Sequence, residues 1–359
     1  MKSVYIHIPF CKSICSYCDF CKMYYNSKFV NDYLEALEKK KKSNYKNEVI
    51  STLYIGGGTP NCLSNDELKK LFDIVKIFKL DKDYEFTIEC NVEFITTDNL
   101  KIFKDNKVNR LSIGIESVNS NNLKYLNRNY DKKLVEEKVL LAKKYFNNIN
   151  GDLIYALPNS NIKDLEEDIS FLLSLDLEHI STYSLIIEDN TILKNNNAKN
   201  IDEEVDYEMY KLICDKLKDY HHYEISNFSK YGYESKHNLT YWHNLNYYGF
   251  GLGASGYIDN IRYDNTRSLN NYIKGNYVLN KEVVDTNLSK EYYLILGLRL
   301  IDGINIRDYN NRYNDDLLKN EVISKLINEN KLVLDKGNIK INIDYIYVSN
   351  DILVEIIGG

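Results

Sequence analysis

The first two-thirds of the chain alternates short apolar runs with longer segments whose apolar positions recur at helical spacing. A β-type run at 3–8 is followed by a helix at 31–42. A strand at 52–55 ends on three glycines, and a helix at 65–78 follows Ser64, a residue type that caps helices. The same alternation predicts strands at 85–90, 110–114, 151–155 and 180–186, helices at 97–105 and 162–175, and a long helical stretch reaching residue 146.

About six β-then-α units fit before residue 190. Such repeats imply parallel strands joined by right-handed crossovers. Six strands are too few for a closed eight-stranded barrel, so we predict an α/β fold with a partial, open (β/α)6-type barrel. In such sheets binding sites lie at the carboxyl ends of the strands.

The pattern changes after residue 190. A charged amphipathic helix is predicted at 202–220, and an irregular segment rich in Tyr, His and Gly at 221–257. The tail shows two helical and two β-type patterns, at 292–300, 316–328, 331–334 and 338–341.

These changes divide the chain into three predicted domains. The barrel occupies 1–190, an α+β extension occupies 191–285, and a small helical domain with a β-hairpin wing, similar to a winged helix, occupies 286–359. No internal repeat or low-complexity linker separates them.

Composition and charge limit the cell compartments and the classes of binding partner that can be expected for this chain. The chain has 359 residues and a net charge of −6, which gives no global electrostatic case for nucleic acid or an anionic membrane. No secretory signal and no run of 18 apolar residues is present, so we predict a cytoplasmic protein without a transmembrane segment. In a reducing compartment the seven cysteines are expected to be free, catalytic or metal-bound.

Four of these cysteines fall within eleven residues. Cys11, Cys15 and Cys18 have the spacing C-x3-C-x2-C, and Cys21 follows. Three thiolates on a short loop can occupy three corners of an iron–sulfur cubane and leave the fourth iron without a protein ligand. The alternatives are a zinc site with Cys21 as the fourth ligand, or plain thiols.

Further short strings follow the cysteine loop in a fixed order, and together with the loop they make the chain resemble the radical S-adenosylmethionine superfamily. Within it, the resemblance is to the group related to oxygen-independent coproporphyrinogen III oxidase. The strings are Gly56–Pro60 (GGGTP), Asn109–Gly114 (NRLSIG), Asp152–Pro158 (DLIYALP), Tyr223–Phe228 (YEISNF) and His237–Trp242 (HNLTYW).

The resemblance implies a [4Fe–4S] cluster on Cys11, Cys15 and Cys18, with S-adenosylmethionine on the fourth iron. Glycines at the end of a strand let the backbone approach such a ligand closely. Glu116 stands where the family usually has Gln and replaces a neutral amide by a carboxylate. The expected S-adenosylmethionine contacts are Tyr5, Gly57, Gly58, Thr59, Glu89, Glu116, Arg128 and Asp152.

Three features favour the heme chaperone branch of this group, known as HemW, over the oxidases. The fourth cysteine is one position later than in the oxidases, and no long segment precedes Cys11. HNLTYW matches the H-N-x-x-Y-W signature that the chaperone branch uses for heme. The resemblance implies a heme site at His237, Tyr241 and Trp242, although a family histidine is absent where this chain has Ala254-Ser255-Gly256.

The predicted function is therefore a heme chaperone that binds heme and transfers it to an acceptor protein, with an electron donor serving the cluster. Cleavage of S-adenosylmethionine, and hence enzyme status, stays open, as does dimer formation. The alternatives are oxidative decarboxylation of coproporphyrinogen III to protoporphyrinogen IX, and a metal-stabilised binding protein without catalysis.

Overall fold

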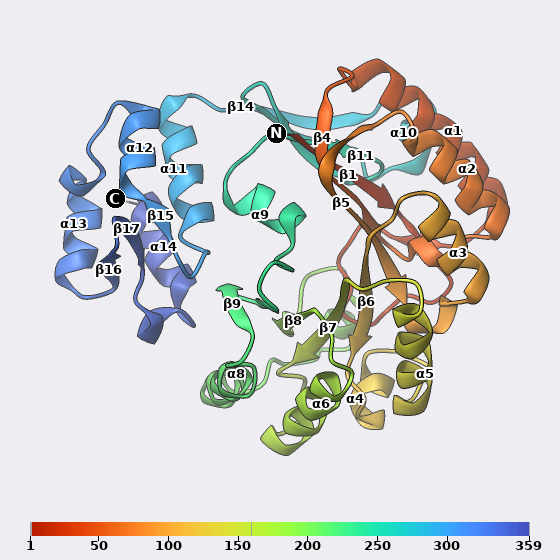
Figure 1. The fold of residues 1–359 in the computed structure, drawn as a ribbon, viewed down its shortest axis with the longest axis horizontal. Helices are drawn as coiled ribbons and strands as arrows, with labels where there is room; N and C mark the ends of the chain where they lie inside the picture. The colour runs from red at the N-terminus through yellow and green to blue at the C-terminus, as the bar shows by residue number, and fades with distance from the viewer. Residues whose placement is uncertain (1, 159, 359) are drawn as a thin grey trace.

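A large twisted sheet forms the body of the molecule. The computed structural model describes residues 2–158 and 160–358 (Figure 1). Twelve strands follow the order β14-β13-β12-β11-β1-β4-β5-β6-β7-β8-β10-β9. The strands from β11 to β8 pair in parallel. They are β11 (Tyr247–Phe250), β1 (Lys2–Ile8), β4 (Val49–Gly57), β5 (Lys79–Asn91), β6 (Arg110–Glu116), β7 (Ile149–Tyr155) and β8 (His179–Ser184).

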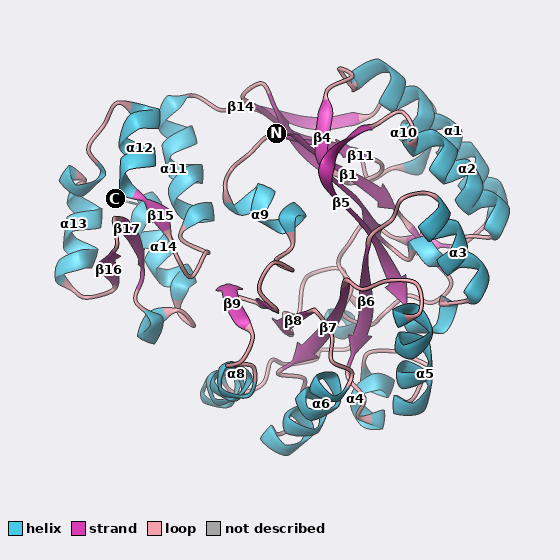
Figure 2. Cartoon of the chain, in the orientation of Figure 1, coloured by secondary structure: helices cyan, strands magenta, loops and turns pink. Residues whose placement is uncertain are grey.

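The six strands predicted before residue 190 are confirmed as β1, β4, β5, β6, β7 and β8, and the sheet curves without closing into a barrel (Figure 1). Helices cover its outer side (Figure 2). The helices of the chain before residue 220 are α1 (Ser27–Asn44), α2 (Asn65–Val75), α3 (Thr97–Asp105), α4 (Ser120–Tyr125), α5 (Lys132–Lys143), α6 (Ile162–Ser174), α7 (Ile192–Asn195) and α8 (Glu203–Lys216), with short 3-10 turns η1 (Pro60–Cys62) and η2 (Val92–Phe94).

Side-chain alternation explains why the inner face of the sheet is polar. On β6, Leu111, Ile113 and Ile115 are fully buried in the hydrophobic core. Arg110 and Ser112, which alternate with these core residues along the strand, therefore point to the inner side. The predicted cap of α2 is confirmed as well, because Ser64 and Glu67 form a reciprocal capping box.

The long helical stretch predicted up to residue 146 is wrong in one respect. It consists of two helices, α4 and α5, separated by a loop at 126–131. Asn127 adopts a left-handed conformation (φ 59°), and Asp131 caps α5 by accepting from the Leu134 amide. Both features stop the first helix and start the second.

The segment 221–257, predicted as irregular, consists largely of short strands and a helix, so that prediction is wrong. Its strand β11 inserts beside β1 and extends the parallel sheet. The four residues of β11 include a glycine, so their sequence alone indicates a strand only weakly. Pairing with β1 stabilises the strand in the folded protein. The elements from here to residue 283 are β9 (His221–Glu224), β10 (Asn227–Ser229), α9 (Lys236–Trp242), β11, β12 (Ser255–Ile258), β13 (Ile261–Asn265), α10 (Leu269–Ile273) and β14 (Val278–Val283).

The C-terminal part packs helices around a small antiparallel sheet of order β15-β17-β16, and lies to one side in Figure 1. The two predicted β segments are confirmed as β16 and β17, which pair in antiparallel fashion. No helix of the described residues is long and apolar enough to cross a membrane. The elements are α11 (Thr286–Gly297), β15 (Ile304–Asn305), α12 (Ile306–Tyr313), η3 (Leu317–Lys319), α13 (Glu321–Asn328), β16 (Leu332–Asp335), β17 (Asn338–Ile341), η4 (Ile343–Tyr345) and α14 (Ser349–Gly358).

Candidate functional site

The three cysteines of the C-x3-C-x2-C spacing line one cavity of about 470 Å³ on the inner side of the sheet. The loop that carries them is closed at its base by two short parallel strands, β2 (Phe10–Cys11) and β3 (Met23–Tyr24). The structure thus brings together Cys11, Cys15 and Cys18, which lie close in sequence but need a bent loop to face one space.

The chemistry of these thiols fits the implied cluster. Burial raises the pKa of Cys18 to about 11 and raises the pKa values of Cys11 and Cys15 above their usual range. Each therefore keeps its proton until a metal displaces it. Among residues 2–158 and 160–358, no three His, Cys, Asp or Glu side chains form a group that could hold a single metal ion.

Cys21 stands apart from the other three cysteines. Its thiol donates to the Arg267 carbonyl at 3.8 Å, and the residue is buried against Gly253. It is absent from the lining of the cavity. The arrangement therefore does not place Cys21 as a fourth ligand beside Cys11, Cys15 and Cys18.

The loop between α4 and α5 holds the cysteine loop in place. The Ser16 hydroxyl donates to the Tyr125 carbonyl at 2.7 Å, and the Ser16 amide donates to the Leu126 carbonyl at 3.2 Å. The side-chain amide of Asn127 donates to the Ile14 carbonyl at 2.8 Å. The break between the two helices is thus the support of the cysteine loop.

A buried ion pair next to this support explains how the chain tolerates Glu116. Arg128 pairs with Glu116, and both side chains are less than a tenth exposed. The Tyr17 hydroxyl, on the cysteine loop, donates to Glu116 Oε1 at 2.9 Å and accepts from Arg128 Nη2 at 3.0 Å. Because Arg128 neutralises it, the carboxylate is a compensated charge at the rim of the cavity.

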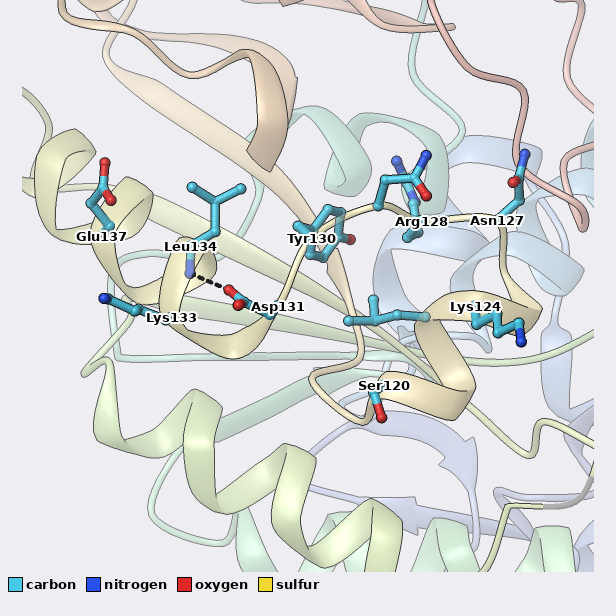
Figure 3. A pocket seen from close by; sticks show the side chains of 11 residues that line it. Ser120, Lys124, Asn127, Arg128, Tyr130, Asp131, Lys133, Leu134 and Glu137 are labelled. Atoms are coloured by element: carbon cyan, nitrogen blue, oxygen red, sulfur yellow. Dashed lines mark hydrogen bonds between the residues drawn. The ribbon is translucent and has the colours of Figure 1, made fainter.

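Arg128 also borders a second pocket, beside the loop between α4 and α5. This pocket has a volume of about 590 Å³ and is lined by α4, the loop and α5. Figure 3 shows its side chains, with Asp131 accepting from the Leu134 amide at the start of α5. Arg128 therefore forms part of the wall between this pocket and the central cavity.

The glycines that end β4 are required by close neighbours. A Cβ on Gly56 would lie 2.6 Å from the Glu89 carboxylate, and one on Gly58 would lie 2.9 Å from Cys11 Sγ. Gly57 has φ 112°, a conformation that glycine adopts readily. Side chains are excluded here so that Glu89 and Cys11 can approach the backbone.

The amides of this segment are used inside the chain, which differs from the expectation that they face a ligand. The Gly57 amide donates to Glu89 Oε2 at 2.8 Å. The amides of Gly58 and Thr59 donate to carbonyls in the segment 8–10 at 2.8 and 2.9 Å. Interaction with a ligand is thus left to the carbonyls and side chains, which suit a donor such as an ammonium group.

Two buried carboxylates lie deeper in the cavity. Glu89 accepts from the Tyr54 hydroxyl at 2.8 Å, and burial raises its pKa to about 7. Asp152 accepts from Asn150 at 2.8 Å and from Ser112 at 3.2 Å, and burial raises its pKa to about 6. Both are held in fixed orientation on the inner face of the sheet.

Tyr5 is the predicted contact that does not line the cavity. Its hydroxyl is bonded to His7 Nδ1 at 2.9 Å, and His7 Nε2 is in turn bonded to the Cys21 carbonyl at 2.6 Å. The predicted S-adenosylmethionine contacts that do line it are Gly57, Gly58, Thr59, Glu89, Glu116, Arg128 and Asp152.

The predicted heme residue His237, on α9, is buried and does not line the cavity. It is 1% exposed, its Nδ1 is bonded to the Thr52 hydroxyl at 2.6 Å, and its Nε2 to the Tyr241 hydroxyl at 2.8 Å. The ring stacks on Tyr54 at 4.9 Å. Burial lowers the pKa of His237 to about 3, so the imidazole is neutral.

The start of α9 is fixed to the barrel by one carboxylate. Glu85 on β5 accepts from the backbone amides of Lys236 and His237, both at 3.0 Å. This arrangement satisfies two amides that have no partner inside the helix. Asn238, the next residue of the motif, lines the central cavity.

Trp242 lies away from the cavity, so the predicted heme residues do not share one surface. It lines a pocket of about 360 Å³ that also contains His221 and His243. The Arg299 guanidinium lies 5.0 Å from its ring. Within the motif, His237 is internal and Trp242 faces the C-terminal helices.

Several polar residues of the cavity had no role in the sequence prediction. What these residues share is their place in the sequence pattern. Each alternates with core residues along a parallel strand, and its side chain therefore faces the inner side of the sheet. They are Arg110, Ser112, Asn150, Ser181 and Tyr183.

Comparison with known proteins gives the family. Residues 5–172 match the model of the radical SAM superfamily. The chain is 38% identical to "Heme chaperone HemW" of Lactococcus lactis subsp. lactis (strain IL1403), over 94% of this chain and 92% of that protein. The chain belongs to the HemW family. A second HemW-family protein, from Bacillus subtilis (strain 168), is 40% identical over 88% of each chain.

A solved structure outside the HemW family confirms the predicted fold. Coproporphyrinogen III oxidase (HemN) from Escherichia coli aligns with a TM-score of 0.86, over 99% of this chain and 89% of that chain. At 18% sequence identity this likeness shows the fold alone. Membership of the radical SAM superfamily implies a [4Fe–4S] cluster, as the cysteine spacing suggested, and S-adenosylmethionine, as the family resemblance implied.

Proposed function

We propose that this chain is a heme chaperone that binds heme and passes it to an acceptor protein, with a [4Fe–4S] cluster and S-adenosylmethionine in the barrel. The observation that carries the proposal is 38–40% identity, over most of the chain, to proteins named heme chaperones. The motif at His237–Trp242 supports it. The oxidase alternative rests on a shared fold, which many activities can use.

Cys11, Cys15 and Cys18 would hold the cluster, which when bound supplies one-electron reduction at an open iron. The rest of the site positions the loop and the ligand. Tyr17 is fixed by Glu116 and Arg128. Glu89 and Asp152, on the cavity wall, would accept hydrogen bonds from an ammonium group and from ribose hydroxyls. An external electron donor belongs to the same proposal.

His237 would bind heme iron through Nε2. Because the ring is neutral, one nitrogen donates and the other accepts. The tautomer that donates from Nδ1 to Thr52 leaves the Nε2 lone pair for Tyr241 or for iron, and the Thr52 bond would orient the ligand. Since His237 is 1% exposed, binding requires α9 to move away from the barrel.

The test is a hemin titration of the anaerobically reconstituted full chain, followed in the Soret band. We expect His237→Ala to weaken hemin binding at least tenfold and to leave the cluster absorbance intact. His243→Ala, at the exposed end of the same helix, is the matched control and should bind like the wild type. If His243→Ala loses binding and His237→Ala keeps it, the assignment to His237 is wrong.

A further inference from the structure

The Arg110 side chain is a buried positive charge without a partner in the described part of the chain. It lies at the inner end of the central cavity, which is the end opposite the three cysteines. Arg110 is the first residue of β6, is 2% exposed and lines the cavity. Throughout the described residues, no hydrogen bond or ion pair reaches its guanidinium, and its Nε is buried without a partner. Arg128, the other buried arginine of this cavity, is by contrast paired.

The carboxylates on β5 and β7, the strands on either side of β6, are already bound to other groups. Glu85 accepts from two amides of α9. Glu89 accepts from Tyr54, and Asp152 accepts from Asn150 and Ser112. Burial raises the pKa of Glu89 to about 7, so its negative charge is only partial at neutral pH. Asp152, whose pKa burial raises to about 6, stays largely ionised there, but its hydrogen bonds go to Asn150 and Ser112 and not to Arg110.

A buried charge is costly unless it is paired and hydrogen-bonded. The planar guanidinium fork matches the two oxygens of a carboxylate, which it binds through two parallel N–H donors. An unpaired arginine that faces a cavity is therefore suited to an anionic group of a ligand.

We propose that Arg110 binds a carboxylate of the ligand that reaches the inner end of the cavity, and that this carboxylate belongs to a propionate side chain of a tetrapyrrole. The assignment rests on the proposed heme function. The competing source of the same chemistry is the amino acid carboxylate of S-adenosylmethionine.

Position separates these two sources. Parallel strands rise about 3.3 Å per residue, so the backbone of Arg110 lies about 13 Å from that of Gly114 on the same strand. The cysteines, Gly57 and Glu116 are at the far end, where the open iron would take the amino acid group of S-adenosylmethionine.

The heme motif lies at the near end. Asn238 of α9 lines the same cavity as Arg110. Glu85, which accepts from the His237 amide, lies two residues before Thr87, and Thr87 is the β5 residue that pairs with Arg110 in the sheet. A propionate on Arg110 would thus belong to a ligand that is also next to α9.

The experiment compares hemin with hemin dimethyl ester, whose propionates carry no charge. Soret titrations would use the reconstituted full chain as wild type, Arg110→Gln, Arg110→Lys and the control Arg312→Gln from α12. S-adenosylmethionine binding would be measured in parallel by equilibrium dialysis. We expect the wild type and the control to prefer hemin over the ester by roughly tenfold to hundredfold.

Arg110→Gln should bind hemin and the ester equally, and its affinity for S-adenosylmethionine should stay within twofold of the wild type. Arg110→Lys, which keeps the charge and loses the fork, should retain a reduced preference and serves if the Gln variant does not fold. A preference for hemin that survives in Arg110→Gln overturns the proposal. Loss of S-adenosylmethionine binding with that preference intact assigns the carboxylate to the other source. If the wild type shows no Soret shift on hemin titration, both the proposed heme function and the assignment of Arg110 are wrong.

Discussion

The two ends of the central cavity are built in different ways. At the cluster end, Cys11, Cys15 and Cys18 come from one short loop and face the open cavity. At the α9 end, His237 is held by contacts from distant strands, with Thr52 on β4 and Glu85 on β5. The thiols at the cluster end face the cavity, whereas the proposed iron ligand at the α9 end, His237, is buried and hydrogen-bonded on both ring nitrogens.

Charge follows the same division. At the cluster end the buried Arg128 is compensated by Glu116. At the α9 end Arg110 has no partner within the described ranges 2–158 and 160–358. We infer that the cluster end is preformed, whereas the α9 end is completed by a ligand and by movement of the helix.

The largest expected effect separates the two ends. Cys15→Ala removes one of three cluster ligands, and we expect it to abolish the iron–sulfur absorbance after anaerobic reconstitution. Hemin affinity should stay within threefold of the wild type, because His237 lies at the other end of the cavity. Cys214→Ala on α8 is the control and should keep the cluster. A parallel loss of hemin binding in Cys15→Ala would show that the two ends are not independent.

The next effect concerns the support of the cluster end. Arg128→Met leaves Glu116 buried and unpaired, and we expect it to lower the free energy of unfolding of the cluster-free chain by about 3–5 kcal/mol. The double variant with Glu116→Gln, which removes the stranded charge, should recover part of this loss. Urea unfolding measures both. A change below about 1 kcal/mol in Arg128→Met would mean that the pair adds little to the support of the cysteine loop.

The cluster end could be predicted from sequence for two reasons. Some of its residues are neighbours along the chain, and the others stand at the ends of strands that have clear hydrophobic patterns. The cysteine spacing and the glycines after β4 are local signals. Glu116 was noticed only as a departure from the family, and its pairing with Arg128 needed the break between α4 and α5, which helical periodicity did not show.

The α9 end could not be predicted in the same way. The strand β11 pairs with a strand 244 residues earlier (Ser3 with Tyr247), and α9 packs on β4, where Thr52 is 185 residues before His237. The motif H-N-x-x-Y-W suggested a heme surface, but burial of His237 is a tertiary property that spacing does not carry. Arg110 lay inside a recognised string, and only the absence of a partner within the described structure singled it out.

The smallest expected effect tests whether His237 must be released. Tyr241→Phe removes the hydroxyl bonded to His237 Nε2 and keeps the aromatic ring. A net hydrogen bond is worth about 1 kcal/mol, so the closed arrangement should lose that much stability, and the apparent hemin affinity should rise about fivefold. Hemin titration in the Soret band measures this change.

Tyr84→Phe is the matched control, because its hydroxyl donates to a backbone carbonyl on the outer surface and its loss should leave hemin affinity unchanged. If Tyr241→Phe instead weakens hemin binding as strongly as His237→Ala, the hydroxyl contacts the ligand directly. The Tyr241 bond would then be part of the bound state rather than a contact that holds α9 closed.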